Sequence, residues 1–269
     1  MNADFHMHTS FSSDSEAAPE AMIEEAIRRG LHTICITDHQ DLDHPKYKSG
    51  EAFRLDFSRY VPTIQKLQKQ YEAQIEILLG VEFGLQPHLG AVCHEMAISY
   101  PFDFIIGSVH LMDGMDPYDG EYFRGRTDEE GYRRAFEITM ENLRKVQDFD
   151  VLGHIDYVVR YGSRKEFTYH CHDYGDILDE ILKFLIANGK GMELNTAGWK
   201  YGLPFAHPHP DILKRYRELG GEIITIGSDA HKPEHLAYDF YRVSDVLKAC
   251  GFKNYTEFHQ RKPVFQQLP

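Results

Sequence analysis

Short apolar runs alternate along the chain with longer segments whose apolar residues recur at helical spacing. Seven of the short runs are predicted strands: Asp4–His8, Thr33–Thr37, Ile75–Phe83, Phe104–His110, Val151–Ile155, Gly191–Asn195 and Glu222–Ser228. The strongest amphipathic segments are residues 19–30, 127–146, 172–189 and 209–220. Such alternation is typical of repeated βα units. The pattern therefore predicts an α/β fold, a (β/α) barrel of about seven strands.

Helix start and stop signals support these segments. Pro19 stands at a plausible first helical position, and Gly30 lies just past the predicted end. Thr127 is followed three residues later by Glu130, which is the pattern of a capping box.

The chain has 269 residues, of which 42% are hydrophobic, so it is long enough to bury one large core. No linker-like or low-complexity stretch divides it, and we expect a single domain over residues 1–269. The start "MNADFHMHTS" lacks the features of a signal peptide, and no run approaches the ~18 apolar residues of a membrane helix. We expect a cytoplasmic protein without a membrane partner.

The charge and cysteine content of the chain limit the kinds of molecule that it is expected to bind. The net charge of −13 argues against binding to nucleic acid or to an anionic membrane surface. Bound divalent cations would reverse the sign locally, so a small anionic substrate stays possible. The four cysteines are far apart and form no C-x-x-C, which predicts buried free thiols: Cys35, Cys93, Cys171 and Cys250.

Histidines and carboxylates follow the ends of the predicted strands. His6 and His8 lie at positions i and i+2 of the first strand and therefore share a face. The other strand-end candidates are His39, Glu82, His110, His154, Asp229 and His231, joined by Asp14 from the loop after the first strand. Singly, each could instead cap a helix or brace a turn. Together they should meet at one barrel mouth, because the carboxyl ends of barrel strands converge there.

These nine candidates offer only nitrogen and oxygen donors, and they exceed what one ion can use. Such donor sets suit zinc, manganese or iron, and a carboxylate such as Glu82 can bridge two ions. We expect two to three divalent metal ions.

The motifs "HMH", "TDH", "GVE", "SVH", "LGHID" and "SDAH", in this order, resemble the polymerase and histidinol phosphatase (PHP) family of metal-dependent phosphoesterases. The stretches "LGHIDYVVRYG" and "ELNTAGWKYG" are most similar to its L-histidinol-phosphate phosphatase branch. The resemblance implies a distorted (β/α)7 barrel with a trinuclear metal centre. It places the ligands in three groups: His6, His8, Glu82 and Asp229; Glu82, His110 and His154; and Asp14, His39 and His231. Asp14 stands where some relatives have histidine.

Further residues are expected to act on substrate. Glu82, Asp229 and His231 are candidate catalytic residues, and Arg160 is a candidate phosphate ligand because its planar fork matches phosphate oxygens. Lys200 and Arg124 are the alternatives to it.

Three other stretches offer weaker candidates. Asn195 ends a strand, and the loop over residues 111–126 offers Tyr118, besides Tyr122 and Phe123, for a substrate ring. This loop could equally be a plain surface loop. Asp41 and Asp43 could meet a cationic amine, although solvated charge is an alternative fate.

The expected reaction is hydrolysis of a small phosphomonoester, L-histidinol phosphate, to L-histidinol and phosphate by a metal-activated hydroxide in histidine biosynthesis. One alternative is another PHP-type phosphoesterase acting on nucleotides or phosphodiesters. A second is a metal-binding accessory module without turnover, against which the missing basic patch counts. The sequence does not indicate an oligomeric state.

Overall fold

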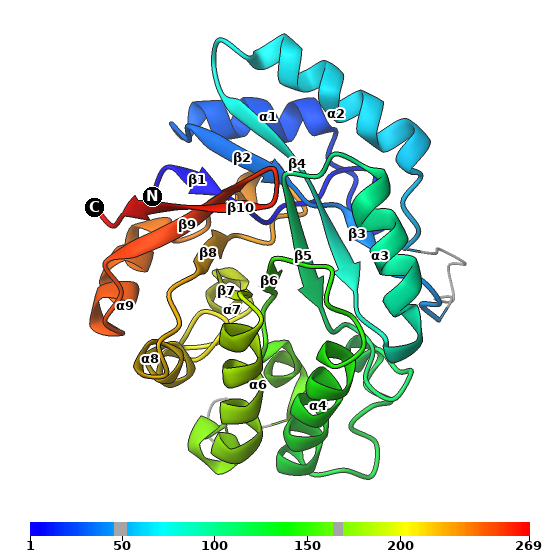
Figure 1. Cartoon of the computed structure of the whole chain (residues 1–269), viewed down its shortest axis with the longest axis vertical. Coiled ribbons are helices and arrows are strands. Elements are labelled where there is room, and N and C mark those ends of the chain that lie inside the picture. Colours follow the sequence, from blue (N-terminus) through cyan, green and yellow to red (C-terminus); the bar gives the residue numbers. More distant parts are fainter. Residues whose placement is uncertain (46–52, 164–168) are drawn as a thin grey trace.

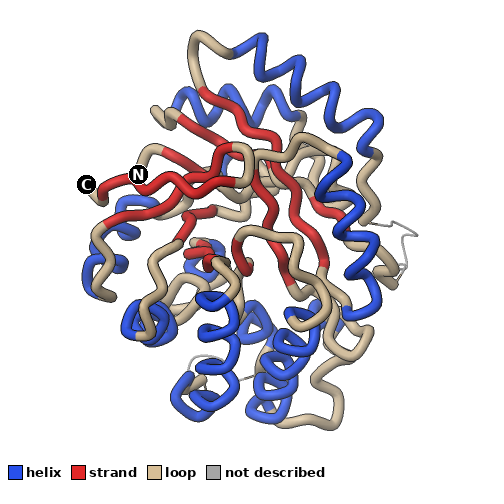
Figure 2. Tube along the Cα trace, in the orientation of Figure 1, coloured by secondary structure: helices blue, strands red, loops and turns tan. Residues whose placement is uncertain are grey.

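The computed structural model describes residues 1–45, 53–163 and 169–269. Parallel strands form the centre of the molecule, and helices surround them (Figures 1 and 2). The strands are β1 (Ala3–Asp4), β2 (Thr33–Ile36), β3 (His39–Gln40), β4 (Glu76–Gly84), β5 (Phe104–Ser108), β6 (Val151–Leu152), β7 (Gly191–Asn195) and β8 (Ile224–Gly227). They are hydrogen-bonded in the order β1-β2-β4-β5-β6-β7-β8, and β3 pairs with β4.

The sheet closes on itself between its first and last strands. Phe5 N donates to Ile226 O at 2.9 Å, and Asp229 N donates to His6 O at 2.8 Å. His8 N adds a third bond, to Ala230 O, at 2.8 Å. The predicted distorted (β/α)7 barrel is therefore confirmed.

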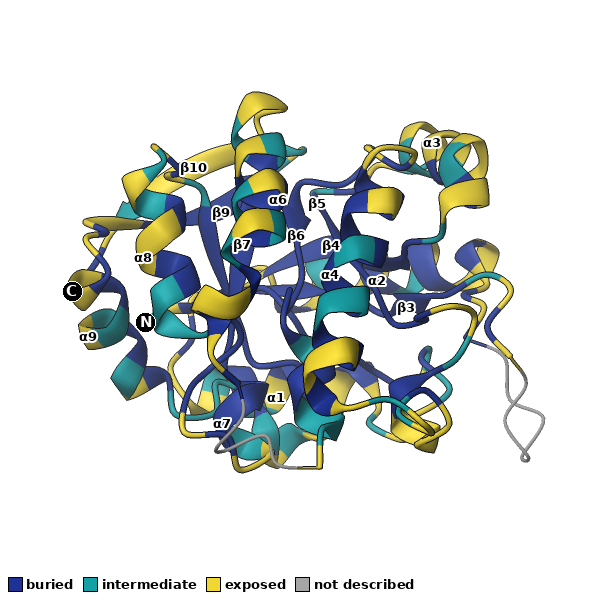
Figure 3. Cartoon of the chain, turned by 90° about the horizontal axis from the view of Figure 1, so that it is seen from below, coloured by how far each residue is buried: buried dark blue, intermediate teal, exposed yellow. Residues whose placement is uncertain are grey.

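The helices are α1 (Pro19–Arg28), α2 (Phe57–Tyr71), α3 (Gly90–Ser99), α4 (Asp128–Leu143), α6 (Gly175–Ala187), α7 (Ala197–Lys200), α8 (Pro210–Glu218) and α9 (Val243–Ala249). Short 3-10 turns are η1 (Pro87–Leu89), η2 (Pro117–Asp119), η3 (Tyr157–Tyr161), η4 (Cys171–Tyr174), η5 (Pro233–His235) and η6 (Phe240–Arg242). The central strands are buried, whereas most of the surrounding helices also expose a face (Figure 3). The predicted capping box at the start of α4 is present, with both reciprocal bonds between Thr127 and Glu130.

The C-terminal hairpin was not among the predicted elements. An antiparallel hairpin of β9 (Asn254–His259) and β10 (Lys262–Gln267) follows α9. Phe258 packs on Phe104 at the start of β5, with ring centroids 5.1 Å apart, and Thr256 Oγ1 accepts a hydrogen bond from Ile224 N at the start of β8. The hairpin therefore covers the barrel end where the strands begin, and the opposite end stays available for the site.

The cysteines and the helices bear on two further features of the chain. The four cysteines are free and buried, as predicted. In the part of the chain that the structure describes, no helix combines the length and apolarity needed to cross a membrane.

Candidate metal centre

The predicted strand-end residues meet at one mouth of the barrel. Glu82 lies near the end of β4, and its register partner on β3 is His39. His110 and His154 each come two residues after their strands, β5 and β6, and Asp229 comes two residues after β8. The convergence follows from the parallel sheet, which brings all carboxyl ends to the same side.

Glu82 stands at the centre of this mouth and is fully buried. Its Oε2 lies 2.9 Å from His39 Nδ1 and 3.3 Å from His6 Nε2. Its Oε1 lies 3.1 Å from His154 Nε2 and 3.3 Å from His110 Nε2. The two oxygens of one carboxylate therefore face two separate groups of imidazoles.

Asp229 lies across the mouth from Glu82, with its Oδ1 3.8 Å from His6 Nε2. Its Oδ1 lies 3.4 Å from His8 Nε2 and 3.5 Å from His231 Nδ1. Its backbone is in the left-handed region, with φ of 52°, which aspartate adopts more readily than most residues. The hydrogen bond from its N–H to His6 O holds this turn.

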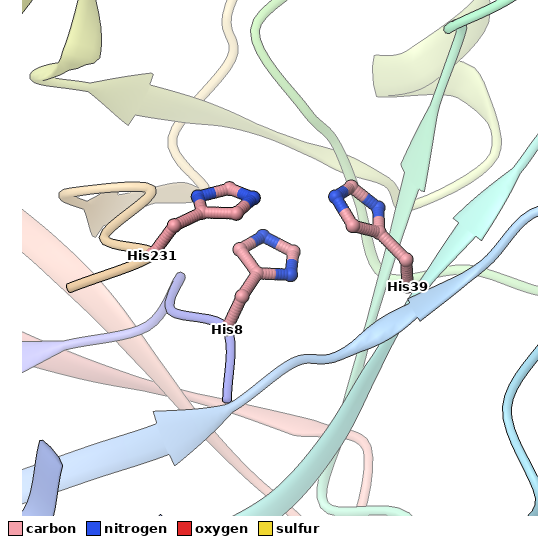
Figure 4. A group of neighbouring side chains, drawn as sticks. All are labelled: His8, His39 and His231. Atoms are coloured by element: carbon pink, nitrogen blue, oxygen red, sulfur yellow. The ribbon is translucent and has the colours of Figure 1, made fainter. Parts of the chain in front are cut away.

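Asp14 completes the outer edge of the mouth. Its Oδ2 lies 3.0 Å from His231 Nε2 and 3.7 Å from His39 Nε2. Figure 4 shows His8, His39 and His231 approaching one another from three different segments. Their donor atoms lie within 4.8 Å of one another. All nine predicted metal ligands are thus brought into one cluster, which we call the inner centre.

The charges of the inner centre compensate each other. Burial acts to raise the pKa of the Glu82 carboxyl, but positive charge on His6, His110 and His39 outweighs it, so that pKa lies well below its ordinary value. The pKa of Asp229 is lowered in the same way, against burial, by His6 and other neighbours. Both shifts favour the ionised carboxylate, which is the form that acts as a metal ligand.

The donor set fits divalent ions. Besides the group of His8, His39 and His231, the mouth holds three further overlapping sets: His6, Glu82 and His154; His6, His8 and Asp229; and His39, Asp41 and His110. All of these donors are imidazole nitrogens or carboxylate oxygens, the ligands that zinc, manganese and iron accept. Asp41 is the member that sequence reasoning did not count as a ligand.

Several buried side chains orient these donors from behind. Glu193 Oε1 lies 2.6 Å from His6 Nδ1, and its Oε2 accepts a hydrogen bond from His154 N. Ser12 Oγ lies 3.2 Å from His8 Nδ1 and donates to Asp38 at 2.6 Å. Such outer partners fix the ring orientation of a ligating histidine. Sequence reasoning missed them, although an acid in the middle of the buried strand "GMELN" was an available signal.

Arg160 lies beside the inner centre and is largely buried. Its Nη2 lies 3.6 Å from Asp229 Oδ2, and its guanidinium stacks over Tyr201 at 4.1 Å and Tyr157 at 4.8 Å from the ring centroids. Lys200 donates to Asp229 O at 2.8 Å and is the second cation near the mouth. Arg124 is instead exposed and pairs with Glu121.

The other predicted substrate contacts have different surroundings. Asn195 is fully buried: its amide donates to Glu193 Oε2 at 3.1 Å, and its Oδ1 accepts from Ala197 N. A substrate contact by Asn195 stays a prediction that this burial does not favour. Tyr118 is 70% exposed, with its ring 6.3 Å from that of Tyr161.

The remaining candidates separate into buried and exposed residues. Tyr122 is fully buried and donates to Gly131 O at 2.7 Å, so it packs the loop in place. Phe123 packs on the same glycine and is partly buried. Asp41 is buried against His110, whereas Asp43 is exposed beside His88.

Comparison with known proteins points to one group. The family model described as "PHP domain" matches residues 4–197. The histidinol-phosphatase of Lactococcus lactis subsp. lactis (strain IL1403) is 31% identical over 261 residues, which are 96% of this chain and 95% of that protein. The probable histidinol-phosphatase of Clostridium acetobutylicum is 32% identical over 250 residues, covering 93% and 94% of the two chains.

Solved structures agree with the sequence matches. The crystal structure of histidinol phosphate phosphatase from Lactococcus lactis, complexed with zinc, L-histidinol and phosphate, superposes with a TM-score of 0.88 at 31% identity and covers 98% of both chains. The putative histidinol phosphatase of Listeria monocytogenes gives a TM-score of 0.71 at 17% identity, over 89% of this chain and 98% of that one. This second likeness shows the shared fold.

Proposed function

The chain belongs to the PHP family, and on this premise we propose that it is a metal-dependent phosphatase that hydrolyses L-histidinol phosphate to L-histidinol and phosphate. Support comes from histidinol-phosphatase relatives that match nearly the full length of the chain. Further support comes from a neighbour of TM-score 0.88 whose structure contains zinc, L-histidinol and phosphate.

The observation that carries the proposal is the position of Glu82 between two groups of histidines, with one carboxylate oxygen toward each. We assign the metal ligands as His6, His8, Asp14, His39, Glu82, His110, His154, Asp229 and His231. Two or three divalent ions held there would activate water as the nucleophile and neutralise charge on the phosphate oxygens. Zinc is the first choice because these donors suit it.

The chain's own residues then bind and orient the substrate. Arg160 is assigned to the phosphate: it lies beside Asp229, and stacking on Tyr157 and Tyr201 fixes its planar donor fork. We assign Glu82, Asp229 and His231 as catalytic residues, because each faces the donor groups that would hold the ions.

Aromatic side chains lead outward from the inner centre. The Tyr157 ring lies 5.1 Å from His154, the Tyr161 ring 5.2 Å from Tyr157, and the exposed Tyr118 ring 6.3 Å from Tyr161. Flat aromatic faces suit an imidazole ring. We assign this series as the path along which the organic part of the substrate lies.

The test compares kcat/KM for histidinol phosphate with a panel of phosphomonoesters and with bis(p-nitrophenyl) phosphate, using protein whose metal content is measured on the same sample. We expect histidinol phosphate to exceed simple sugar phosphates by orders of magnitude. Comparable values across the panel would instead mean a broad phosphatase, and faster diester turnover would mean a phosphodiesterase. A fully active metal-free protein would contradict the metal assignment.

A further inference from the structure

A second cluster of possible metal ligands lies outside the barrel, away from the inner centre. Cys171 and His172 open η4, and Asp211 lies in the first turn of α8. Each offers one donor atom, and the three atoms lie within 4.8 Å of one another. We call Cys171, His172 and Asp211 the outer cluster.

The distances in this cluster centre on one carboxylate oxygen. Asp211 Oδ2 lies 3.4 Å from His172 Nε2 and 3.8 Å from Cys171 Sγ. His209 Nδ1 lies 3.7 Å from both the same oxygen and the same sulfur. A thiol, two imidazoles and a carboxylate thus point at one another from two segments of the chain.

These separations match the edges of a tetrahedral site. With zinc bonds of about 2.0–2.2 Å to nitrogen or oxygen and about 2.3 Å to sulfur, neighbouring donors lie roughly 3.3–3.7 Å apart. The distances from Asp211 Oδ2 to His172 Nε2, 3.4 Å, and to Cys171 Sγ, 3.8 Å, need only a slight contraction, and all three donor atoms lie within 4.8 Å of one another. We propose that the outer cluster is a second metal site, which binds zinc or a similar transition metal through Cys171, His172 and Asp211. The site does not depend on the proposed phosphatase activity.

The surroundings allow an ion to enter and to stay. The His172 side chain is 82% exposed and that of Asp211 45%, whereas Cys171 is buried. The cluster borders a hollow between α6 and α8 that Leu178, Leu182 and Ile212 also line. Two donors therefore face solvent, while the sulfur is shielded on the protein side.

The fourth position has two possible occupants. His209 Nδ1 accepts a hydrogen bond from Asp211 N at 3.2 Å and so caps α8. Its Nδ1 can join the ion only by giving up this cap, and otherwise water would fill the position. On binding, the Cys171 S–H bond breaks, a sulfur–metal bond forms and the proton leaves to solvent. The ion would then tie η4 to the start of α8.

Cobalt is a probe that separates the two metal sites. All nine proposed ligands of the inner centre are nitrogen or oxygen donors, so a thiolate-to-cobalt charge-transfer band in the near ultraviolet reports the outer cluster. We expect this band in protein produced in cobalt-supplemented medium, and its complete loss in Cys171→Ser. Elemental analysis of the same samples should show one metal fewer per chain in this variant.

Cys250→Ser is the matched control, because Cys250 is also buried and its thiol donates to Pro210 O rather than facing imidazoles. It should keep the band. His172→Ala, at an exposed position that tolerates truncation, should weaken cobalt binding at least about tenfold, since even outer partners of a ligand contribute 10- to 100-fold. No band in the wild-type protein, or a band that persists in Cys171→Ser, would overturn the proposal.

Discussion

The inner centre and the outer cluster both place a carboxylate among imidazoles, yet they are built in different ways. Glu82 is fully buried, and its imidazole partners come from four different strand ends. Asp211 is 45% exposed, and its partners come from one neighbouring 3-10 turn and from the cap of its own helix. The inner centre therefore needs the whole barrel to exist, whereas the outer cluster needs only two surface segments to stay together.

The largest effect should come from the residue that joins the two halves of the inner centre. Glu82→Gln keeps the side-chain shape but removes the charge that holds two cations close, so kcat should fall by about a thousandfold or more. Elemental analysis should show loss of inner metal, while the cobalt–thiolate band of the outer cluster persists. Glu76→Gln, on the exposed start of the same strand, is the control. Near-normal turnover with full metal content would make Glu82 peripheral.

Arg160→Met should produce the next effect. A hydrogen bond to a charged group contributes ~1.5–3 kcal/mol, which corresponds to roughly a 10- to 150-fold loss of kcat/KM. Metal content should not change, because arginine is not a ligand. If the contact tightens in the transition state, kcat falls as well as KM rising. Arg124→Met, at an exposed arginine paired with Glu121, should behave like wild type. If the kinetic constants of Arg160→Met stay within twofold of wild type, Lys200 rather than Arg160 would be assigned as the residue that binds the phosphate.

Glu193→Gln tests the support behind the inner centre. Glu193 Oε1 lies 2.6 Å from His6 Nδ1, and Glu193 Oε2 accepts a hydrogen bond from the backbone N–H of His154. The variant should therefore misorient a proposed ligand without removing one. Loss of a partner of this kind lowers metal affinity or activity by roughly 10- to 100-fold. Metal titrations should show the loss, and excess metal should restore part of the rate. The control is Glu257→Gln, a buried acid of the hairpin at the other barrel end. No change in metal affinity would assign Glu193 to packing alone.

The smallest effect on turnover is expected from Cys171→Ser. The outer cluster holds no residue of the inner centre, so kcat/KM should stay within about twofold of wild type while the cobalt band disappears. A larger loss would mean that the two regions are coupled. The physical link would be His209, whose N–H donates at 2.8 Å to Asp156, two residues beyond His154.

Much of the inner centre could be predicted from the chain because its donors follow buried strands. Once the repeated βα pattern was recognised, parallel pairing required the strand ends to meet, and this placed the nine candidate ligands in one cluster. Two residues of the site were not predicted in their observed roles: Glu193 was not named, although it stands in the buried strand β7, and Asp41 was named only as a contact for a cationic amine. Asp41 lies in a loop with another acid, Asp43, and only the fold turns one toward His110 and the other toward solvent.

The unpredicted parts of the fold also have physical reasons. The turn of the β9–β10 hairpin uses Gln260 and Arg261 at φ of 51° and 64°, where an Asn-Gly pair would be the usual signal. Contacts with the barrel end compensate for this unfavourable turn, and such contacts cannot be read locally. The outer cluster could not be predicted for a similar reason. Neither "CHD" nor "HPD" has the spacing of a metal site by itself, and only the fold brings η4 next to the start of α8.

The closure of the barrel determines when the candidate metal centre can be completed. The segment that carries His6 and His8 pairs with the residues after β8, and Asp4 contacts Ser228 across 224 residues of chain. During synthesis, these two histidines emerge first but find Asp229 and His231 only when most of the polypeptide has left the ribosome. His6 and His8 are therefore synthesised long before Asp229 and His231, the residues that they contact in the folded chain. On the proposed ligand assignment, full metal loading would be a late event, and truncated products that lack β8 would not form the complete centre.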